Sequence, residues 1–200
     1  MERKPKKAGA RTEAAGGRAR LIETARRLFT ERGAANVGIN DVTDTAGVAR
    51  MTLYNNFASK EALTVAVYRD SAQNTLRNLD AVIAASRTES GRVGAVFDHF
   101  GKGCDRAGFR GCSFIHASFQ DENPHGAVYA VVQAYKRALR ERIFGALDEG
   151  RKGRAELADQ IVILLDGAVT EAYIKGVANP IRAGKRAAQT LLDAAVRGND

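Results

Sequence analysis

Apolar residues recur along almost the whole chain with the spacing of one face of an α-helix. Between Arg18 and Arg32 they fall at i, i+1, i+4, i+7 and i+8, from Leu21 to Phe29. No segment alternates strictly between apolar and polar residues, as a half-buried strand would. Beyond the N-terminal region, only Pro124 and Pro180 interrupt the pattern. These features predict an all-α protein of about nine helices, without internal repeats.

The predicted helices follow from the apolar stripe and from the residues that stop it. Gly33 ends the first helix, and Gly47 ends a short second one at a position where glycine adopts positive φ without a Cβ penalty. Ser59 is placed to cap the fourth helix. The expected ranges are 18–32, 39–46, from 50 to about 57, 60–86, 93–100, 112–119, 128–143, 155–175 and 181–196.

Length and composition limit the location that we expect for the chain. Its 200 residues are 44% hydrophobic, which suffices for a sizeable core. The longest aliphatic run, Ile161–Leu165, is far shorter than the roughly 18 apolar residues of a membrane span. No apolar segment follows the basic N-terminus, and two cysteines are too few for a disulfide framework. We therefore expect a cytoplasmic protein with no membrane partner.

Positive charge is concentrated in the first third of the chain. Residues 1–60 contain 12 Lys or Arg against 6 Asp or Glu, whereas residues 61–200 contain 19 against 17. A basic region attached to a nearly neutral one favours a polyanionic partner such as the DNA backbone, although a merely solvated basic surface is the alternative. Residues 1–16 hold five Lys or Arg and are predicted to be a basic flexible arm, either inert or in contact with phosphates or a minor groove.

A short helix, a glycine turn and a second short helix follow one another between residues 39 and 57. Val42 and Ala46 form the inner edge of the first helix, Val48 fills the turn, and Leu53 and Phe57 face inward on the second. The second helix keeps polar and basic residues on its other face. This arrangement is typical of a helix-turn-helix, which places its second helix in the major groove of DNA.

The polar face of that second helix carries side chains that match base edges and phosphates. Arg50 can donate two hydrogen bonds to guanine, Asn55 can pair with adenine, and Met51 or Thr52 can meet a thymine methyl group. Tyr54 and Lys60 flank this face and suit phosphate oxygens. The predicted DNA-binding residues are Arg50, Met51, Thr52, Tyr54, Asn55, Asn56 and Lys60.

The segment Gly33–Leu63, "GAANVGINDVTDTAGVARMTLYNNFASKEAL", resembles the helix-turn-helix of the TetR family of transcriptional regulators. The matching elements are the Asp41-Val42 pair, "AGV" at 46–48, "TLYNNF" at 52–57 and "SKEAL" at 59–63. The resemblance implies phosphate contacts from Thr52, Tyr54 and Lys60, and base contacts from around Arg50, Met51 and Asn55. Val37-Gly38 and Ala49 depart from the family pattern because they lack hydroxyls that cap helices, a loss of about 1 kcal/mol each.

The resemblance also implies a division of the chain and a mode of action. After the arm, residues 17–61 would form the DNA-binding domain and residues 62–200 an effector-binding and dimerisation domain. The chain would repress transcription from a palindromic double-stranded DNA operator, and an unidentified small-molecule effector would release it. Aromatic residues crowd the fifth to seventh helices, and a pocket there would be lined by Phe97, Phe100, Phe114, His116, Phe119 and Tyr135.

The last two helices carry more apolar surface than one core requires. The apolar arc of residues 155–175 covers roughly 180°, against the roughly 100° that faces a single core. The final helix is rich in alanine, which lets helices approach closely. We expect an isologous homodimer in which each copy contributes two helices. The predicted interface residues are Leu157, Ile161, Leu164, Leu165, Ala168, Ala187, Leu191 and Ala194.

Several alternatives remain open from the sequence. Cys112 and His116 are spaced i, i+4, which can present two ligands to one metal or a thiol and a base to a substrate. Cys104 and Cys112 together could form a thiol-based redox sensor. No phosphate-binding loop, nucleophile elbow or carboxylate pair is evident, so we predict no enzyme, metal or cofactor. An all-α protein-interaction adaptor is the main alternative to DNA binding.

Overall fold

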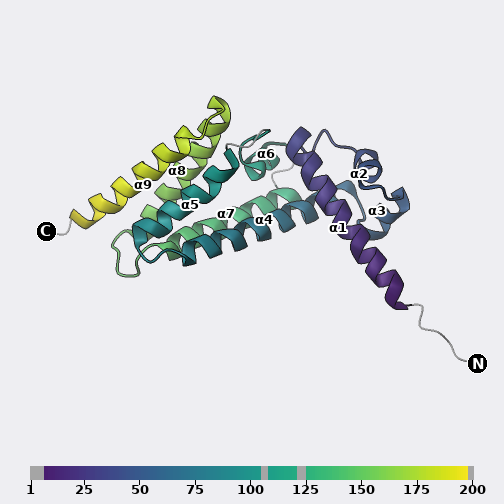
Figure 1. Ribbon diagram of the computed structural model, residues 1–200, viewed down its shortest axis with the longest axis horizontal. Coiled ribbons are helices and arrows are strands. Elements are labelled where there is room, and N and C mark those ends of the chain that lie inside the picture. Colours follow the sequence, from purple (N-terminus) through teal and green to yellow (C-terminus); the bar gives the residue numbers. More distant parts are fainter. Residues whose placement is uncertain (1–6, 105–107, 121–124, 198–200) are drawn as a thin grey trace, which may run out of the picture. The chain divides into compact units, whose positions relative to one another are not determined.

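The computed structural model describes residues 7–104, 108–120 and 125–197, and all regular structure within these ranges is helical. The all-α class and the helix count predicted from the sequence are confirmed for this part of the chain. No helix among these residues is long and apolar enough to cross a membrane. The helices labelled in Figure 1 are α1 (Lys7–Arg32), α2 (Ile39–Ala46), α3 (Arg50–Asn56), α4 (Lys60–Ala84), α5 (Glu89–Cys104), α6 (Ser113–Gln120), α7 (Ala127–Ala146), α8 (Arg154–Lys175) and α9 (Asn179–Arg197).

The first helix is longer than its apolar stripe predicts. Residues 1–6 of the expected arm lie outside the described residues, but residues 7–16 form the first turns of α1. This stretch contains alanine at positions 8, 10, 14 and 15, and alanine has the highest helix propensity of all residues. Helix propensity therefore extends α1 beyond the residues that face the core.

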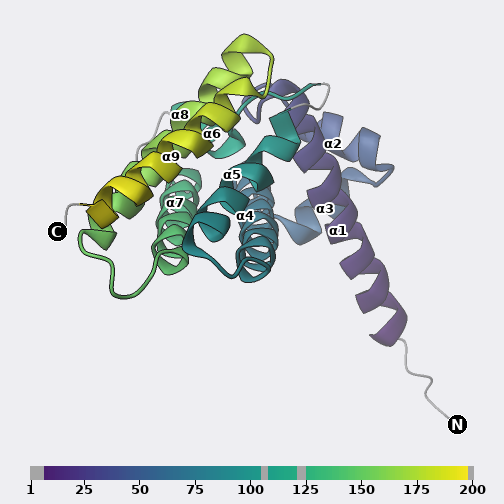
Figure 2. The ribbon, with the colours of Figure 1, turned by 60° about the vertical axis from the view of Figure 1, so that its left-hand side comes forward.

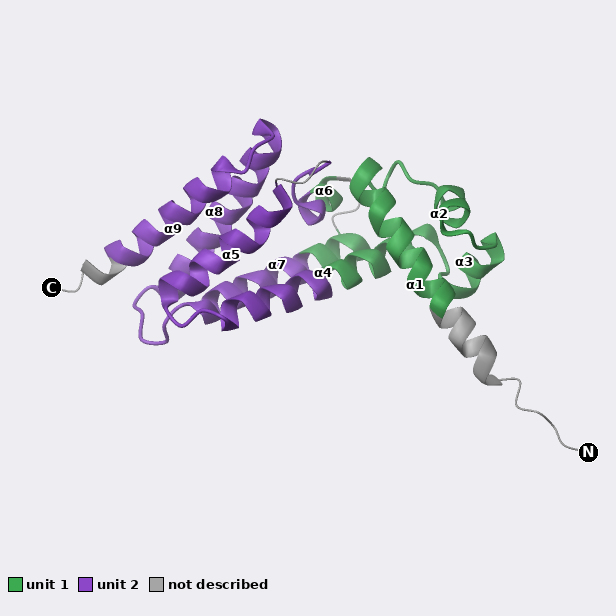
Figure 3. Cartoon of the chain, in the orientation of Figure 1, with its two compact units in different colours: residues 1–71, 116–132 green, residues 72–115, 133–200 purple. Residues whose placement is uncertain are grey.

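The chain divides into two compact units, coloured separately in Figure 3. The first unit comprises residues 1–71 and 116–132, and the second comprises residues 72–115 and 133–200. Helices α4, α6 and α7 each contribute residues to both units. The domain boundary that we expect near residue 61 remains a prediction.

In the first unit, α1, α2 and α3 pack around a common apolar core. Leu21 and Leu28 of α1, Val42 of α2 and Leu53 of α3 are almost completely buried. Burying each of these side chains stabilises the fold by about 1.5 to 3 kcal/mol. The core therefore fixes the orientation of the short helices α2 and α3, which are too short to be stable alone.

In the second unit, α8 and α9 run side by side, as both Figure 1 and Figure 2 show, and both pack against α5. A Cβ atom added at Gly184 of α9 would lie 2.9 Å from the Cβ of Ala168 and 3.1 Å from the ring of Phe97. Glycine at this position thus permits the close approach of α9 to α8 and α5. Phe97 is fully buried beneath this contact.

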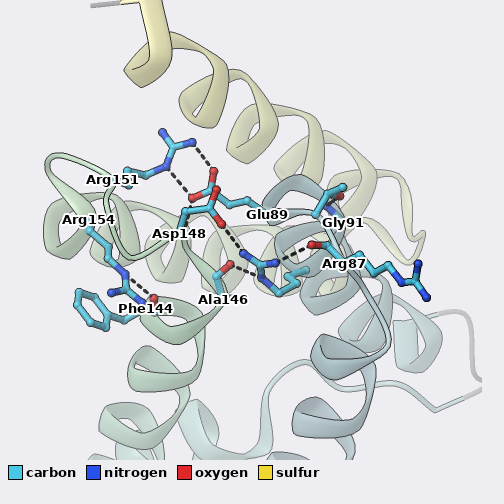
Figure 4. A network of polar contacts seen from close by, with 10 residues as sticks. Arg87, Glu89, Gly91, Phe144, Ala146, Asp148, Arg151 and Arg154 are labelled. Atoms are coloured by element: carbon cyan, nitrogen blue, oxygen red, sulfur yellow. Dashed lines mark hydrogen bonds and ion pairs between the residues drawn. The ribbon is translucent and has the colours of Figure 1, made fainter. Parts of the chain in front are cut away.

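Charged side chains tie the start of α5 to the connection between α7 and α8 (Figure 4). The Glu89 carboxylate accepts two hydrogen bonds from Arg151, one from Nε to Oε1 at 2.7 Å and one from Nη2 to Oε2. It also accepts a hydrogen bond from the Asp148 amide at 2.8 Å. Arg92 donates to the Asp148 carboxylate at 2.6 Å. Arg151 also donates to the Leu192 carbonyl at 3.0 Å. One polar network therefore links α5, the α7–α8 connection and α9 within the second unit.

Candidate nucleic-acid interface

The turn between α2 and α3 has the geometry that the sequence predicts. Gly47 adopts φ 63° and ψ 39°, a left-handed conformation that glycine tolerates because it has no Cβ. Its amide donates to the carbonyls at the end of α2, and the Val48 amide donates to the Thr43 carbonyl at 3.1 Å. These bonds end α2 and redirect the chain into α3. The two helices thus form a helix-turn-helix held on α1.

The helix starts lack the side-chain caps that the sequence analysis found missing. Neither Gly38 nor Ala49 makes a side-chain capping hydrogen bond. At α2, however, the Asp41 carboxylate accepts the Gly38 amide at 2.6 Å, and this bond is one half of a capping box. An acidic residue at the third position of a helix, here Asp41, is the sequence signal for this bond. The start of α3 has no equivalent group.

The outer face of α3 projects large side chains into solvent. Met51 is 68% exposed and Tyr54 is 42% exposed, and Arg50 and Asn55 are exposed beside them. Thr52 is half-buried on the same helix. An exposed methionine on a short helix has no packing role within this chain, and its position suits contact with another molecule. The structure thus brings the predicted base-reading residues together on one surface.

Arg50 lies over the ring of Tyr54 in this conformation. Its guanidinium carbon is 5.7 Å from the ring centroid, and its Nη2 atom donates to the Tyr54 hydroxyl at 3.5 Å, the limit of hydrogen-bonding distance. A cation over an exposed aromatic ring gains about 0.5 to 1 kcal/mol. Leaving Tyr54 for a guanine edge therefore costs Arg50 little.

Two other predicted residues are held by local contacts. The Asn56 side-chain amide donates to the Thr52 carbonyl at 2.8 Å and is half-buried. The Lys60 ammonium group donates to the Ala35 carbonyl at 3.2 Å. Lys60 thus reaches back to the connection between α1 and α2, and it can contact a phosphate only by giving up or sharing this bond. Neither contact is visible in the sequence pattern.

A contact between α1 and the α3 region was not predicted from the sequence. The Arg18 guanidinium carbon lies 5.1 Å from the centroid of the Phe57 ring. A Cβ atom added at Gly17, which is buried, would lie 3.2 Å from the Thr52 methyl group. The part of α1 around Gly17 and Arg18 therefore packs on α3 and on Phe57 at its end. Neither a glycine nor an arginine outside the apolar stripe gives a sequence signal for such packing.

The second unit contains a cavity of about 370 Å³ that receives three of the six predicted pocket residues, Phe100, Phe114 and Tyr135. Phe97 is fully buried in the core. His116 and Phe119 belong to the first unit, where Phe119 is 83% exposed. The cavity is also lined by polar residues that the prediction did not include, among them Thr75, Asn78, His99 and Ser113.

Cys104 and Cys112 form no disulfide bond. Cys104 is buried, and Cys112 lines the cavity. Burial raises the pKa of Cys112 despite hydrogen bonds from the Ile115 and Phe114 amides, which act in the opposite direction. A redox-sensing cysteine needs a lowered pKa, so this environment disfavours that alternative. Among the described residues, no three His, Cys, Asp or Glu side chains are arranged to hold a metal ion.

The surfaces of α8 and α9 form an open apolar groove of about 820 Å³ with a charged rim. Of the predicted interface residues, Leu164, Ala168 and Ala187 line it. Leu191 is half-buried and Ala194 is exposed. Leu157, Ile161 and Leu165 are buried within the protomer and form part of its own core, so they offer no surface to a partner.

The most exposed apolar residue along this groove, Ile163, was missed in the sequence analysis. Ile163 is 70% exposed, and Ile174 of the same helix is 67% exposed. Gly167 and Glu171 lie between them at helical spacing and interrupt the apolar pattern on which the prediction relied. The apolar pattern of α8 is therefore less regular on the exposed face along the groove than on the face that packs in the protomer's core.

Residues 21–67 match the family described as bacterial regulatory proteins, tetR family. The chain is 45% identical over 62 residues to an HTH-type transcriptional regulator of Mycobacterium tuberculosis, a match that covers 30% of each chain. It is 24% identical over 140 residues to the HTH-type transcriptional repressor KstR2 of Rhodococcus jostii, covering 68% of this chain and 66% of the repressor. The match to the Mycobacterium tuberculosis relative thus spans less than a third of that protein's length.

A solved structure extends the likeness to nearly the whole chain. A TetR-family transcriptional regulator from Streptomyces coelicolor superposes with a TM-score of 0.84 at 27% identity, covering 90% of this chain and 96% of that chain. The reduced form of Escherichia coli NemR superposes with a TM-score of 0.78 at 20% identity, covering 88% and 97% of the two chains, which is a likeness of fold alone. The helix-turn-helix of this chain thus matches the tetR family of bacterial regulatory proteins, and the fold of nearly the whole chain is similar to that of a TetR-family transcriptional regulator.

Proposed function

We propose that this protein is a homodimeric, sequence-specific DNA-binding transcriptional repressor that a small molecule releases from its operator. The observation that carries the proposal is the exposed outer face of α3 on a helix-turn-helix. A helix-turn-helix places its second helix in the major groove, where each base pair presents a distinct set of donors and acceptors. The repressor role is supported by relatives named as repressors, such as KstR2.

Within this proposal, some residues of α3 contact bases, whereas others, together with Lys60 at the start of α4, contact phosphates. Arg50 donates two hydrogen bonds to a guanine, Asn55 pairs with an adenine, and Met51 or Thr52 contacts a thymine methyl group. Tyr54, Asn56 and Lys60 would contact the phosphate backbone, and such contacts fix the register of the protein on the duplex. Base contacts provide the sequence preference, and phosphate contacts provide affinity that depends on salt.

The proposed dimer uses the groove on α8 and α9. An exposed apolar face is removed from water only by a partner of matching shape, and a second copy of the chain supplies the same face through a two-fold axis. Gly167, Ala183 and Ala187 line the groove and let helices approach closely, while Ile163 supplies an exposed apolar contact. Glu171 and Lys175 on α8 and Arg182 and Arg186 on α9 carry charges of both signs along the groove. The α3 helices of the two copies would then engage successive major grooves of a palindrome.

The proposed effector site is the cavity in the second unit. A ligand there can change DNA affinity only if it binds the DNA-bound and free conformations with different affinities. We further propose that the protein acts in the cytoplasm, without a membrane partner. Regulation rather than catalysis is its proposed role, because the proposal rests on three features that serve binding: the outer face of α3, the groove on α8 and α9, and the cavity in the second unit.

A DNA-binding measurement on single variants tests this function. Fluorescence anisotropy with operator DNA should show that Arg50→Ala weakens binding by about 1 to 3 kcal/mol on the preferred sequence and much less on random DNA. Arg137→Ala, which changes an exposed arginine on α7, serves as the charge-matched control and should bind as the wild type does. Equal losses on preferred and random DNA would contradict base reading. Absence of any DNA binding would instead favour a protein-interaction adaptor.

A further inference from the structure

The size of the cavity in the second unit limits the molecule that it can hold. A cavity of roughly 150 Å³ accommodates one benzene ring. The volume here is about 370 Å³, which is room for two fused rings and a short substituent. A ligand portion of about 10 to 15 non-hydrogen atoms therefore fits.

Aromatic side chains form much of the cavity wall. Phe114 and Tyr135 stack with their centroids 3.8 Å apart and their planes inclined by 15°. Phe100 lines the wall nearby, with the His99 ring standing edge-on to it at 5.3 Å. Contacts between aromatic rings contribute about 0.5 to 1.5 kcal/mol beyond the burial of their area, so this wall favours a planar aromatic ligand.

Tyr135 brings a hydrogen-bond donor to the cavity wall. Its side chain is 3% exposed and lines the cavity. Burial raises the pKa of Tyr135, assisted by the nearby Cys112 and Asp166, so the hydroxyl keeps its proton and remains a donor. A ligand with an acceptor oxygen opposite this group would accept a hydrogen bond from it.

The charges at the cavity disfavour a cation. Lys102 is the only charged residue among the described residues that line it, and none of these lining residues is a carboxylate. Burial and the neighbouring Lys102 both lower the pKa of His99, which is therefore neutral at pH 7. Asp166, the acid whose charge acts on Tyr135, is paired with Lys136. Among the described lining residues, a cationic ligand would thus find no counter-charge, whereas an anionic ligand would find Lys102 and a neutral acceptor would find the Tyr135 hydroxyl.

We propose that the cavity binds a planar aromatic molecule of about two rings that carries an acceptor oxygen, neutral or singly negative, which hydrogen-bonds to the Tyr135 hydroxyl. This inference rests on the proposed function, because it names the class of effector for the same cavity. Tyr135 sets the preference for an acceptor, Phe114 and Phe100 set the preference for a planar ring, and Lys102 sets the preference against positive charge.

Four naphthalene derivatives probe these preferences on the full-length protein. 2-Acetylnaphthalene carries a neutral acceptor, 2-ethylnaphthalene lacks it, 2-naphthoate is an anion and 2-naphthylmethylammonium is a cation. The chain contains no tryptophan, so naphthyl fluorescence reports binding without interference from it. We expect 2-acetylnaphthalene to bind about 2- to 10-fold more tightly than 2-ethylnaphthalene, the range of one net hydrogen bond. We expect 2-naphthoate to bind at least tenfold more tightly than 2-naphthylmethylammonium.

Two variants assign these preferences to their residues. Tyr135→Phe removes only the hydroxyl, and it should reduce the acetyl-to-ethyl affinity ratio to about one while leaving the affinity for 2-ethylnaphthalene unchanged or improved. Tyr173→Phe, on the exposed end of α8, is the matched control and should keep the wild-type ratio. Lys102→Met should weaken 2-naphthoate alone, and it tests the charge preference independently if Tyr135→Phe fails to fold.

An unchanged acetyl-to-ethyl ratio in Tyr135→Phe, or tighter binding of the cation than of the anion, would overturn the ligand class. So would the absence of binding by all four probes to protein that still binds its DNA. The proposed function fails in a different way. If the probes bind with the expected order but leave DNA affinity unchanged, the cavity binds this class of ligand without controlling repression.

Discussion

The ion pair between Glu89 and Arg151 gives the sharpest prediction about stability. Glu89 accepts two hydrogen bonds from Arg151 and a third from the Asp148 amide, and the two side chains of the pair are only about 10% exposed. Glu89→Gln keeps the shape of the side chain and one acceptor oxygen. It removes the negative charge, and it places an amide group, itself a donor, against the donors of Arg151. Breaking a buried pair costs about 3 to 5 kcal/mol, so we expect this partial replacement to cost about 2 to 4 kcal/mol.

Urea unfolding at a fixed protein concentration measures this cost. With a slope of about 2 kcal/mol per molar, the midpoint should fall by roughly 1 to 2 M. Glu31→Gln is the control, because Glu31 pairs with Arg27 one helical turn away at 3.4 Å and both side chains are about half exposed. That surface pair should contribute about 0.5 kcal/mol or less. If Glu89→Gln costs no more than Glu31→Gln, the network in Figure 4 is not what joins α5 to α9.

The same substitution carries a pH dependence of defined sign. Burial alone would raise the pKa of Glu89, but the hydrogen bonds from Arg151 and Asp148, with the charges of Arg151 and Arg92, outweigh it and hold the pKa below its usual value. A lowered pKa contributes stability above the unfolded-state value of about 4.3, and this contribution is lost as the pH falls through the folded-state value. The difference between wild type and Glu89→Gln should therefore be full at pH 7 and shrink below about pH 4.

Three further predictions concern the helix-turn-helix region and the groove on α8 and α9. Ala49→Ser adds the missing cap at α3 and should stabilise the protein by about 1 kcal/mol in urea unfolding; no gain would mean that the α3 amides already have partners. Lys60→Ala should flatten the salt dependence of DNA binding by about one unit per subunit, whereas the exposed Lys152→Ala should leave the slope unchanged. Ile163→Glu should weaken self-association more than 100-fold in sedimentation velocity, while Lys152→Glu should not; a dimer that survives Ile163→Glu would move the interface elsewhere.

The helix-turn-helix could be predicted from the sequence because its determinants are local. A helical stripe, a glycine at the end of α2 and a polar outer face on α3 all lie within about twenty residues, and each has one structural meaning. The cap that Asp41 provides has a sequence signal of the same local kind. The contact of Arg18 with Phe57 has none, because a cation over a ring depends on how two helices pack.

The faces of α8 could not be assigned from the sequence. An apolar arc of roughly 180° shows that two surfaces are covered, but not which half faces the protomer's own core. The structure buries Leu157, Ile161 and Leu165 inside the protomer and leaves Ile163 exposed. Close packing at Gly184 brings α9 against the side of α8 that carries Ala168, a contact between two helices that neither sequence segment shows alone.

The aromatic residues proposed for the effector pocket were separated by the fold. Phe100, Phe114 and Tyr135 line the cavity, whereas Phe97 fills the core and Phe119 is exposed. Aromatic composition predicts that a pocket exists but not its members, because core and cavity walls use the same side chains. The place of Tyr135 in the cavity wall becomes evident only in three dimensions.

Selection of bound DNA from a random duplex pool tests most directly the claim that the α3 face reads a palindrome. Wild-type protein should enrich two inverted half-sites whose centres lie about one helical turn, 10 to 10.5 base pairs, or a multiple of it apart. Arg50→Ala should lose its preference at one or two symmetric positions in each half-site while keeping the rest. Enrichment of no common sequence by wild-type protein, or an identical sequence from Arg50→Ala, would contradict this account.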